Sequence, residues 1–132
     1  MTNLQFADEV LARIEAMGAP YHERAYLFVL AAIEYLQARL PERRHVSGAE
    51  LAWACRDFAV AQYGLMARTV LEHWGVTRTD DLGRLVFILV EAGLLVTQPD
   101  DREEDFAAVF RFDDAFGASF DWDGMPDPTR GG

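Results

Sequence analysis

The sequence predicts a mainly α-helical domain that contains a winged-helix-like helix-turn-helix and ends in a short β-hairpin. Three observations support this fold class. Apolar residues recur at helical spacing in several runs. A short helical run, a glycine turn and a longer helical run follow one another over residues 65–92. Residues 94–112 read as two short strands around a charged turn.

The first two helices are expected before residue 41. Residues 6–17 carry apolar side chains at helical spacing, and Gly18 supplies a C-terminal stop. The apolar positions of this first helix are Phe6, Val10, Leu11, Ile14 and Met17. Residues 25–40 are apolar almost all round, and Pro41 ends the run, so this segment is expected to be the central core helix.

A capping box predicts where the third helix starts. Ser47 and Glu50 form an S-x-x-E pair, in which each side chain bonds the other residue's amide. The helix that follows places one apolar face inward and closes at Gly64. That face consists of Leu51, Cys55, Phe58 and Ala59.

The predicted helix-turn-helix comes next. The shorter helix turns Met66, Val70, Leu71 and Trp74 inward, and Gly75 begins a tight connection. Thr79 is expected to cap the second helix, whose first turn holds two acids that suit the positive end of the helix dipole.

The predicted hairpin over residues 94–112 would stand where a winged-helix protein carries its wing. By strand alternation, its packing residues would be Leu95, Val96, Val109, Phe110 and Phe112. The tip from Asp100 to Asp105 holds five acids and one arginine, so we expect it to be exposed and to contribute nothing to nucleic-acid binding.

The length and charge of the chain bound the classes of function. A chain of 132 residues with 51% hydrophobic content fits a single domain with a real core. The net charge is −10, and it is uneven: residues 1–79 hold 9 acids and 8 arginines, whereas residues 80–132 hold 13 acids and 4 arginines. The second predicted turn helix offers Arg84 alone to a DNA groove, so the sequence argues against nucleic-acid binding through this face.

Four blocks of the sequence resemble a known family. They are "AYLFVLAAIEYL", "RHVSGAEL", "MARTVLEHWGV" with "TDDLGRLVFILVEAGLL", and "DFAAVFRFDDAF". In this order, over about residues 21–116, they resemble the Minf-type family of conserved hypothetical bacterial proteins. The resemblance implies no reaction, cofactor or binding residue.

The sequence contains no recognisable catalytic or metal-binding pattern. Ser47 is accounted for as a cap, and Cys55 lies on an apolar stripe, where cysteine behaves as a small buried hydrophobe. His22, His45 and His73 are far apart in the sequence, and none has a second ligand one helical turn away. We therefore expect a non-enzymatic protein without a cofactor or metal.

The C-terminal residues suggest a binding segment. Residues 117–132 contain turn formers and little periodicity, which predicts a flexible acidic and aromatic tail after a single domain over residues 1–116. Phe116, Phe120 and Trp122 alternate with aspartates, a mixture found in segments that dock on apolar grooves. The equal alternative is that these aromatics fold back on their own domain.

The only basic cluster offers a second function. Arg39, Arg43 and Arg44 with His45 form a loop before the capping box, and they would serve a nucleic-acid- or ribosome-associated winged-helix protein. The simpler interpretation is a solvated loop near a helix C-terminus. An enzyme with an unrecognised site is the third reading.

The expected address is the cytoplasm. Acidic and basic residues interrupt any apolar core of a secretory signal, and no apolar run reaches the ~18 residues of a membrane span. The single cysteine, Cys55, fits a reducing compartment. The sequence thus predicts a cytoplasmic protein-protein interaction module that binds a protein partner or forms a homodimer.

Overall fold

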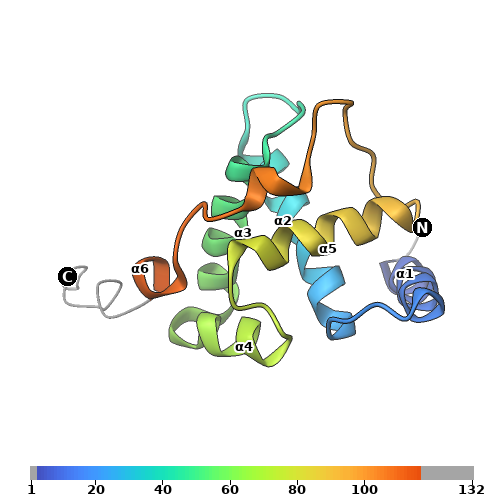
Figure 1. Cartoon of the computed structure of the whole chain (residues 1–132), viewed down its shortest axis with the longest axis horizontal. Helices are drawn as coiled ribbons and strands as arrows, with labels where there is room; N and C mark the ends of the chain where they lie inside the picture. Colours follow the sequence, from blue (N-terminus) through green and yellow to red (C-terminus); the bar gives the residue numbers. More distant parts are fainter. Residues whose placement is uncertain (1–2, 117–132) are drawn as a thin grey trace.

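The structure, a computed structural model, describes the backbone of residues 3–116 and the side chains of residues 8–116. These residues form a mainly helical domain, which confirms the predicted α class (Figure 1). The elements in chain order are α1 (Asn3–Met17), α2 (Glu23–Arg39), α3 (Gly48–Tyr63), the 3₁₀ turn η1 (Gly64–Met66), α4 (Ala67–His73), α5 (Thr79–Glu91), the 3₁₀ turn η2 (Glu103–Phe106) and α6 (Phe112–Phe116).

The predicted β-hairpin and its wing are wrong, because residues 3–116 contain no strand. Residues 95–98 have no regular secondary structure, and residues 103–106 and 112–116 are helical. Local hydrogen bonds replace the strand ladder: the Asp101 side chain accepts from the Gln98 amide at 2.7 Å, and Asp105 accepts from the Arg102 amide at 3.1 Å. Such aspartate turns compete directly with strand pairing.

The core lies where α2 packs against α3 and α5 (Figure 1). Tyr26 and Val29 of α2 are fully buried, as are Leu85 and Leu89 of α5. α2 is therefore the central core helix, as predicted. α1 contributes Val10, while its predicted partner Met17 is 41% exposed.

The start of α3 confirms the predicted capping box. The Ser47 hydroxyl accepts from the Glu50 amide at 3.1 Å, and the Glu50 carboxylate accepts from the Ser47 amide at 2.8 Å. Further along α3, Cys55 is buried as expected, and this burial raises the pKa of its thiol to about 12. A thiol with such a pKa is almost entirely protonated near neutral pH and is a poor nucleophile.

The prediction that Thr79 caps α5 is wrong, because another residue makes the capping hydrogen bonds. Thr79 is already helical and fully buried, and its hydroxyl accepts from the Val109 amide at 3.1 Å. The capping group is Asp81, which accepts from the Thr77 amide at 2.9 Å and the Arg78 amide at 3.1 Å. A carboxylate here also meets the positive end of the helix dipole. Leu71 and Trp74 of the preceding helix are buried as predicted, whereas Met66 is 55% exposed.

Two glycines let η2 lie directly on the helices. A Cβ at Gly48 of α3 would stand 2.9 Å from the Asp105 Cβ, and one at Gly83 of α5 would stand 2.9 Å from the Phe106 Cβ. The buried Phe106 side chain therefore reaches the core at the junction of α3 and α5. No helix within residues 3–116 is long and apolar enough to cross a membrane.

Candidate functional site

Residues 94–102 form an arch that leaves α5 and returns to η2 (Figure 1). One side-chain contact ties the arch to the loop before α3: His45 Nε2 lies 3.0 Å from Asp101 Oδ1. Asp101 uses its second oxygen on the Gln98 amide. Val96 of the arch is 95% exposed. The arch is thus held by the packing of Leu94 and Leu95 on the core, by η2 at its end and by one polar contact.

A cavity of about 260 Å³ lies beneath the arch, and we call it the arch pocket. Its walls come from α2, the loop before α3, the start of α3, α5, the arch and η2. The apolar lining residues are Ile33, Val46, Leu51, Val86, Phe87, Leu95, Val96 and Phe106. Eight polar or charged residues also line it, so the cavity joins an apolar wall to polar groups that could orient a ligand.

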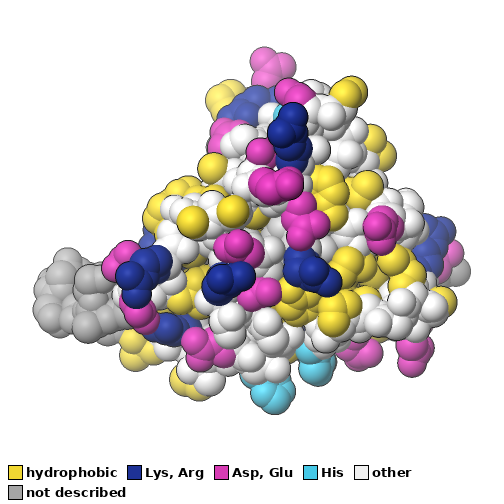
Figure 2. Space-filling model, viewed as in Figure 1, with side chains coloured by type: hydrophobic (Ala, Val, Ile, Leu, Met, Phe, Trp, Pro, Cys, Tyr) yellow, Lys and Arg dark blue, Asp and Glu magenta, His cyan; other side chains and the backbone are white. Residues whose placement is uncertain are grey.

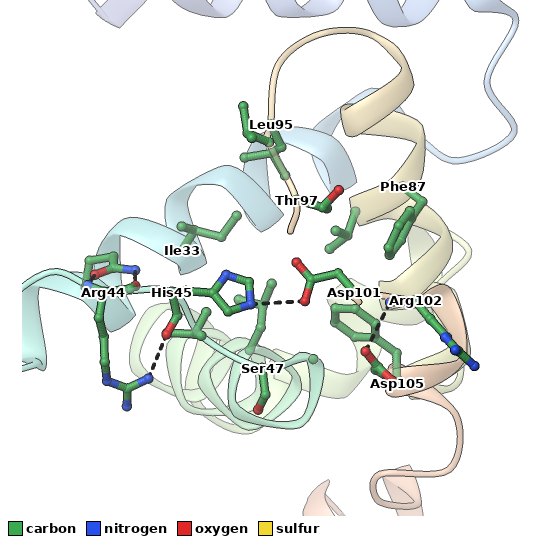
Figure 3. A pocket seen from close by; sticks show the side chains of 17 residues that line it. Ile33, Arg44, His45, Ser47, Phe87, Leu95, Thr97, Asp101, Arg102 and Asp105 are labelled. Carbon is green, nitrogen blue, oxygen red and sulfur yellow. Dashed lines mark hydrogen bonds and ion pairs between the residues drawn. The ribbon is translucent and has the colours of Figure 1, made fainter. Parts of the chain in front are cut away.

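Some polar side chains of the arch pocket surround the cavity, and others point away from it. In Figure 3, His45, Thr97 and Asp101 lie around the cavity, whereas the Arg44 and Arg102 side chains point away from it. Within residues 8–116, neither the Thr97 hydroxyl nor His45 Nδ1 has a hydrogen-bond partner. The pocket therefore offers a free hydroxyl and a free imidazole nitrogen among apolar walls.

Three acids lie close to the arch pocket along the chain but do not line it, and we call them the acidic rim. They are Asp100, which precedes Asp101, and Glu103 and Glu104 of η2, which line a separate cavity with Asp80 and Ala107. These three carboxylates are exposed and have no partner among the described side chains, whereas Asp101 and Asp105 have the hydrogen bonds given above. Two of the five acids at the predicted tip therefore build turns, and three face solvent. The expectation that the tip contributes nothing to nucleic-acid binding stays a prediction.

The predicted basic loop is largely neutralised. Arg43 pairs with Glu34 through two contacts of 3.2 Å, and Arg44 pairs with Glu50 at 2.7 Å. Arg39 lies over the Tyr35 ring, with its guanidinium carbon 4.7 Å from the ring centroid. The two ion pairs lower the pKa of Glu34 and lower that of Glu50 to about 2, with a hydrogen bond to Arg as the main cause in each case.

Of the three aromatic residues predicted to bind a partner, only Phe116 lies within the described residues. Phe116 is half-buried and packs on Phe112 with ring centroids 5.0 Å apart. Phe120 and Trp122 lie outside the described residues. Phe110 joins this cluster to Trp53 of α3 at 4.5 Å, and Trp53 remains 42% exposed.

Comparison with known proteins gives no relative for this chain. No family model, no curated protein and no solved structure matches it. The resemblance to the Minf-type family therefore stays a prediction, and the function must be argued from the structure.

Sequence reasoning missed most of the arch pocket. It singled out His45 but not its partner Asp101, because 56 positions separate them and no local pattern joins them. It also treated the histidines as isolated, yet the rings of His22 and His73 lie with centroids 6.0 Å apart. No third metal-ligating side chain joins this pair within the described part of the chain.

Proposed function

We propose that this chain is a non-enzymatic protein-binding module whose arch pocket receives a large apolar side chain from a partner segment rich in basic residues. The observation that carries the proposal is the apolar wall of the arch pocket, with three exposed acids in the adjoining segment 100–104. Interfaces often gain most of their affinity from one apolar anchor in a desolvated pocket, while surrounding charges set the choice of partner.

Charge favours a basic partner over two other occupants of the pocket, namely the chain's own tail and a second copy of the chain. The free carboxylates of Asp100, Glu103 and Glu104 would attract Arg or Lys of a partner. The chain's own tail carries Asp121, Asp123 and Asp127 and would be repelled by the same rim. A second copy of this chain, with a net charge of −10, is disfavoured for the same reason.

The neutralised basic loop weighs against the nucleic-acid alternative. Binding to a phosphate backbone depends on free cations, and Arg43 and Arg44 already pair with carboxylates of their own chain. The enzyme alternative would use His45 and Asp101 as a base and its orienting carboxylate. The Ser47 hydroxyl points away from the imidazole in Figure 3 and accepts from the Glu50 amide, so Ser47 is not placed for activation by this pair.

Selection from a displayed library of random peptides tests the proposal. We expect the full chain to enrich peptides with Trp, Phe or Leu within a few residues of at least two Arg or Lys residues. Leu95→Glu, which puts a charge in the pocket, and Thr97→Phe, which narrows it, should both abolish binding of these peptides. The matched control is Leu65→Glu, at a side chain that is 69% exposed in η1, far along the chain from the arch.

Two results would overturn the proposal. One is enrichment of acidic peptides, and the other is undiminished binding by both pocket variants. A chain that dimerises in light scattering, and that Leu95→Glu makes monomeric, would instead place a second copy in the pocket. Circular dichroism of each variant verifies that the fold is retained.

A further inference from the structure

A second cavity lies where α4, the start of α5 and the segment before α6 meet. Its volume is about 280 Å³, and we call it the arginine cleft because three arginines from separate segments line it. They are Arg68 of α4, Arg78 before α5 and Arg111 before α6. Dark blue and magenta side chains are interspersed on this part of the surface, over α6, α4 and the start of α5 (Figure 2). The cleft is also lined by Asp80 and Asp113, and Arg68 pairs with Glu72 at 2.9 Å, so Arg78 and Arg111 are the arginines with the most free donors.

Two of these arginines grip one carboxylate. Arg68 Nη2 lies 2.9 Å from Asp113 Oδ1, and Arg111 Nη2 lies 3.4 Å from Asp113 Oδ2. The hydrogen bond from Arg68 lowers the pKa of Asp113 below its ordinary value. The Asp113 side chain is nevertheless 61% exposed. The cleft therefore already holds an anionic group between two guanidiniums, at a position open to solvent.

The remaining binding capacity of the cleft is large. Arg78 lies 3.9 Å from Asp80, too far for a hydrogen bond, and its side chain is 71% exposed. The Arg111 side chain is 78% exposed, and its contact with Asp113 is long. Each guanidinium has five N–H donors, so both arginines retain several donors for a ligand.

Backbone strain marks the same cleft. Ala108 lines it and has a φ of 51°, the one positive φ at a non-glycine residue in the described chain. Two contacts from α5 hold this conformation: Asp80 accepts from the Ala108 amide at 3.3 Å, and Thr79 accepts from the Val109 amide at 3.1 Å. Left-handed non-glycine residues are concentrated at ligand sites, where surrounding contacts compensate their cost.

We propose that the arginine cleft binds the phosphoryl group of a small phosphate compound, which takes the place of the Asp113 carboxylate between Arg68 and Arg111. Arg78 lines the same cleft and would offer a third guanidinium to the phosphoryl oxygens. Planar guanidiniums match phosphate oxygens in pairs, and such charge-assisted hydrogen bonds are the strong ones. Phe110 lines the cleft and would contact the body of an ester. This site is separate from the arch pocket.

Asp113 acts in this proposal as a built-in competitor. A ligand must displace the carboxylate, which can swing away because it is exposed. Removing its charge without changing its size should therefore strengthen binding. If the contact between α4 and α6 is only a structural ion pair, removing the charge should leave anion binding unchanged and should loosen the attachment of α6.

The test is an NMR titration of the full chain, which follows the Nε–Hε signals of the arginines. Phenyl phosphate and inorganic phosphate are added separately at constant ionic strength, with sodium chloride as the reference salt. We expect saturable shifts of Arg68 and Arg111 with phosphate compounds only. Asp113→Asn should lower the dissociation constant roughly tenfold, and Arg111→Gln should raise it roughly tenfold. Arg24→Gln, at an exposed arginine outside the cleft, should change nothing.

The outcomes separate the possible sources and the failure. Tighter binding of phenyl phosphate identifies an ester as the ligand, and equal or tighter binding of inorganic phosphate identifies the free ion. Shifts that grow linearly and equally with chloride would show general screening and overturn the proposal. So would an unchanged dissociation constant in Asp113→Asn, provided that its backbone spectrum matches that of the original chain.

Discussion

Residues 23–91 and residues 94–116 are held in place by different forces. In the first region, α2, α3 and α5 meet through fully buried apolar side chains such as Val29 and Leu85. In the second, Phe106 and Phe112 are the large buried residues. Aspartate and threonine oxygens accept backbone amides before Phe106, at Gln98 and Arg102, and between the two phenylalanines, at Ala108 and Val109. Both cavities lie where the two regions meet. The difference teaches that a helical block packed through apolar side chains carries an edge whose path is set largely by polar contacts to the backbone, and that this edge lines both cavities.

The largest expected effect is in the first region. Leu85→Ala should lower the free energy of unfolding by about 2–5 kcal/mol, because Leu85 is fully buried in α5 and its truncation leaves a cavity. Urea denaturation measures this loss. Leu65→Ala, at an exposed leucine, is the matched control and should change the free energy by less than ~0.5 kcal/mol. Equal effects at the two positions would contradict the buried core described here.

The next effect is at the junction of the two regions. Gly83→Ala should destabilise by about 1–3 kcal/mol, because its new Cβ would stand 2.9 Å from Phe106 Cβ and 3.0 Å from the Glu103 carbonyl oxygen. At an open helical site, the same change would stabilise by up to ~1 kcal/mol. The sign of the change in thermal denaturation therefore decides whether η2 packs on α5 as described.

A smaller loss is expected at the start of α3. Ser47→Ala should cost about 1 kcal/mol, because it removes the hydroxyl that accepts from the Glu50 amide. Peptide binding in the arch pocket should otherwise be retained. If the variant lost binding at full stability, Ser47 would be a functional residue rather than a cap.

The Glu50 carboxylate makes a smaller contribution that depends on pH. Its pKa is lowered to about 2 in the folded chain, mainly by Arg44, from an unfolded value of about 4.3. The stabilisation is therefore complete above about pH 4.3 and is lost as the pH falls toward 2. Because Glu50 and Arg44 are both partly exposed, we expect it to be under ~1 kcal/mol. The stability difference between the original chain and Glu50→Gln should shrink between about pH 6 and pH 3; a constant difference would contradict this origin.

The smallest effect is expected at the acidic rim. Replacing Asp100, Glu103 and Glu104 with Ser should leave the unfolding free energy nearly unchanged, since exposed unpaired charges contribute little. Replacing Asp101 and Asp105 with Ala should cost about 1–3 kcal/mol, because each accepts a backbone amide. Comparable losses in the two variants would mean that the five acids are not divided as described.

The sequence predicted the features that depend on neighbours along the chain. Helical spacing located the main helices, and the Ser47–Glu50 pair located the start of α3, because both patterns act within one or two turns. The failures involve distant partners. Nothing beside Gly83 or Gly48 indicates that η2 packs there, and His45 gives no indication of Asp101. The hairpin prediction failed because alternating residues also suit an extended segment whose aspartates bond their own backbone.

The single cysteine provides a probe of local unfolding, because the rate at which its thiol is labelled reports how often α3 opens. Cys55 faces the core from α3 and is nearly inaccessible, and burial raises the pKa of its thiol, so it does not react while it stays buried. An alkylating reagent would therefore modify the native chain only during transient separation of α3 from its neighbours. The ratio of the labelling rate in the native chain to that in urea would give the free energy of this opening. Repeating the measurement with a bound peptide would show how far occupancy of the arch pocket slows the motion of α3.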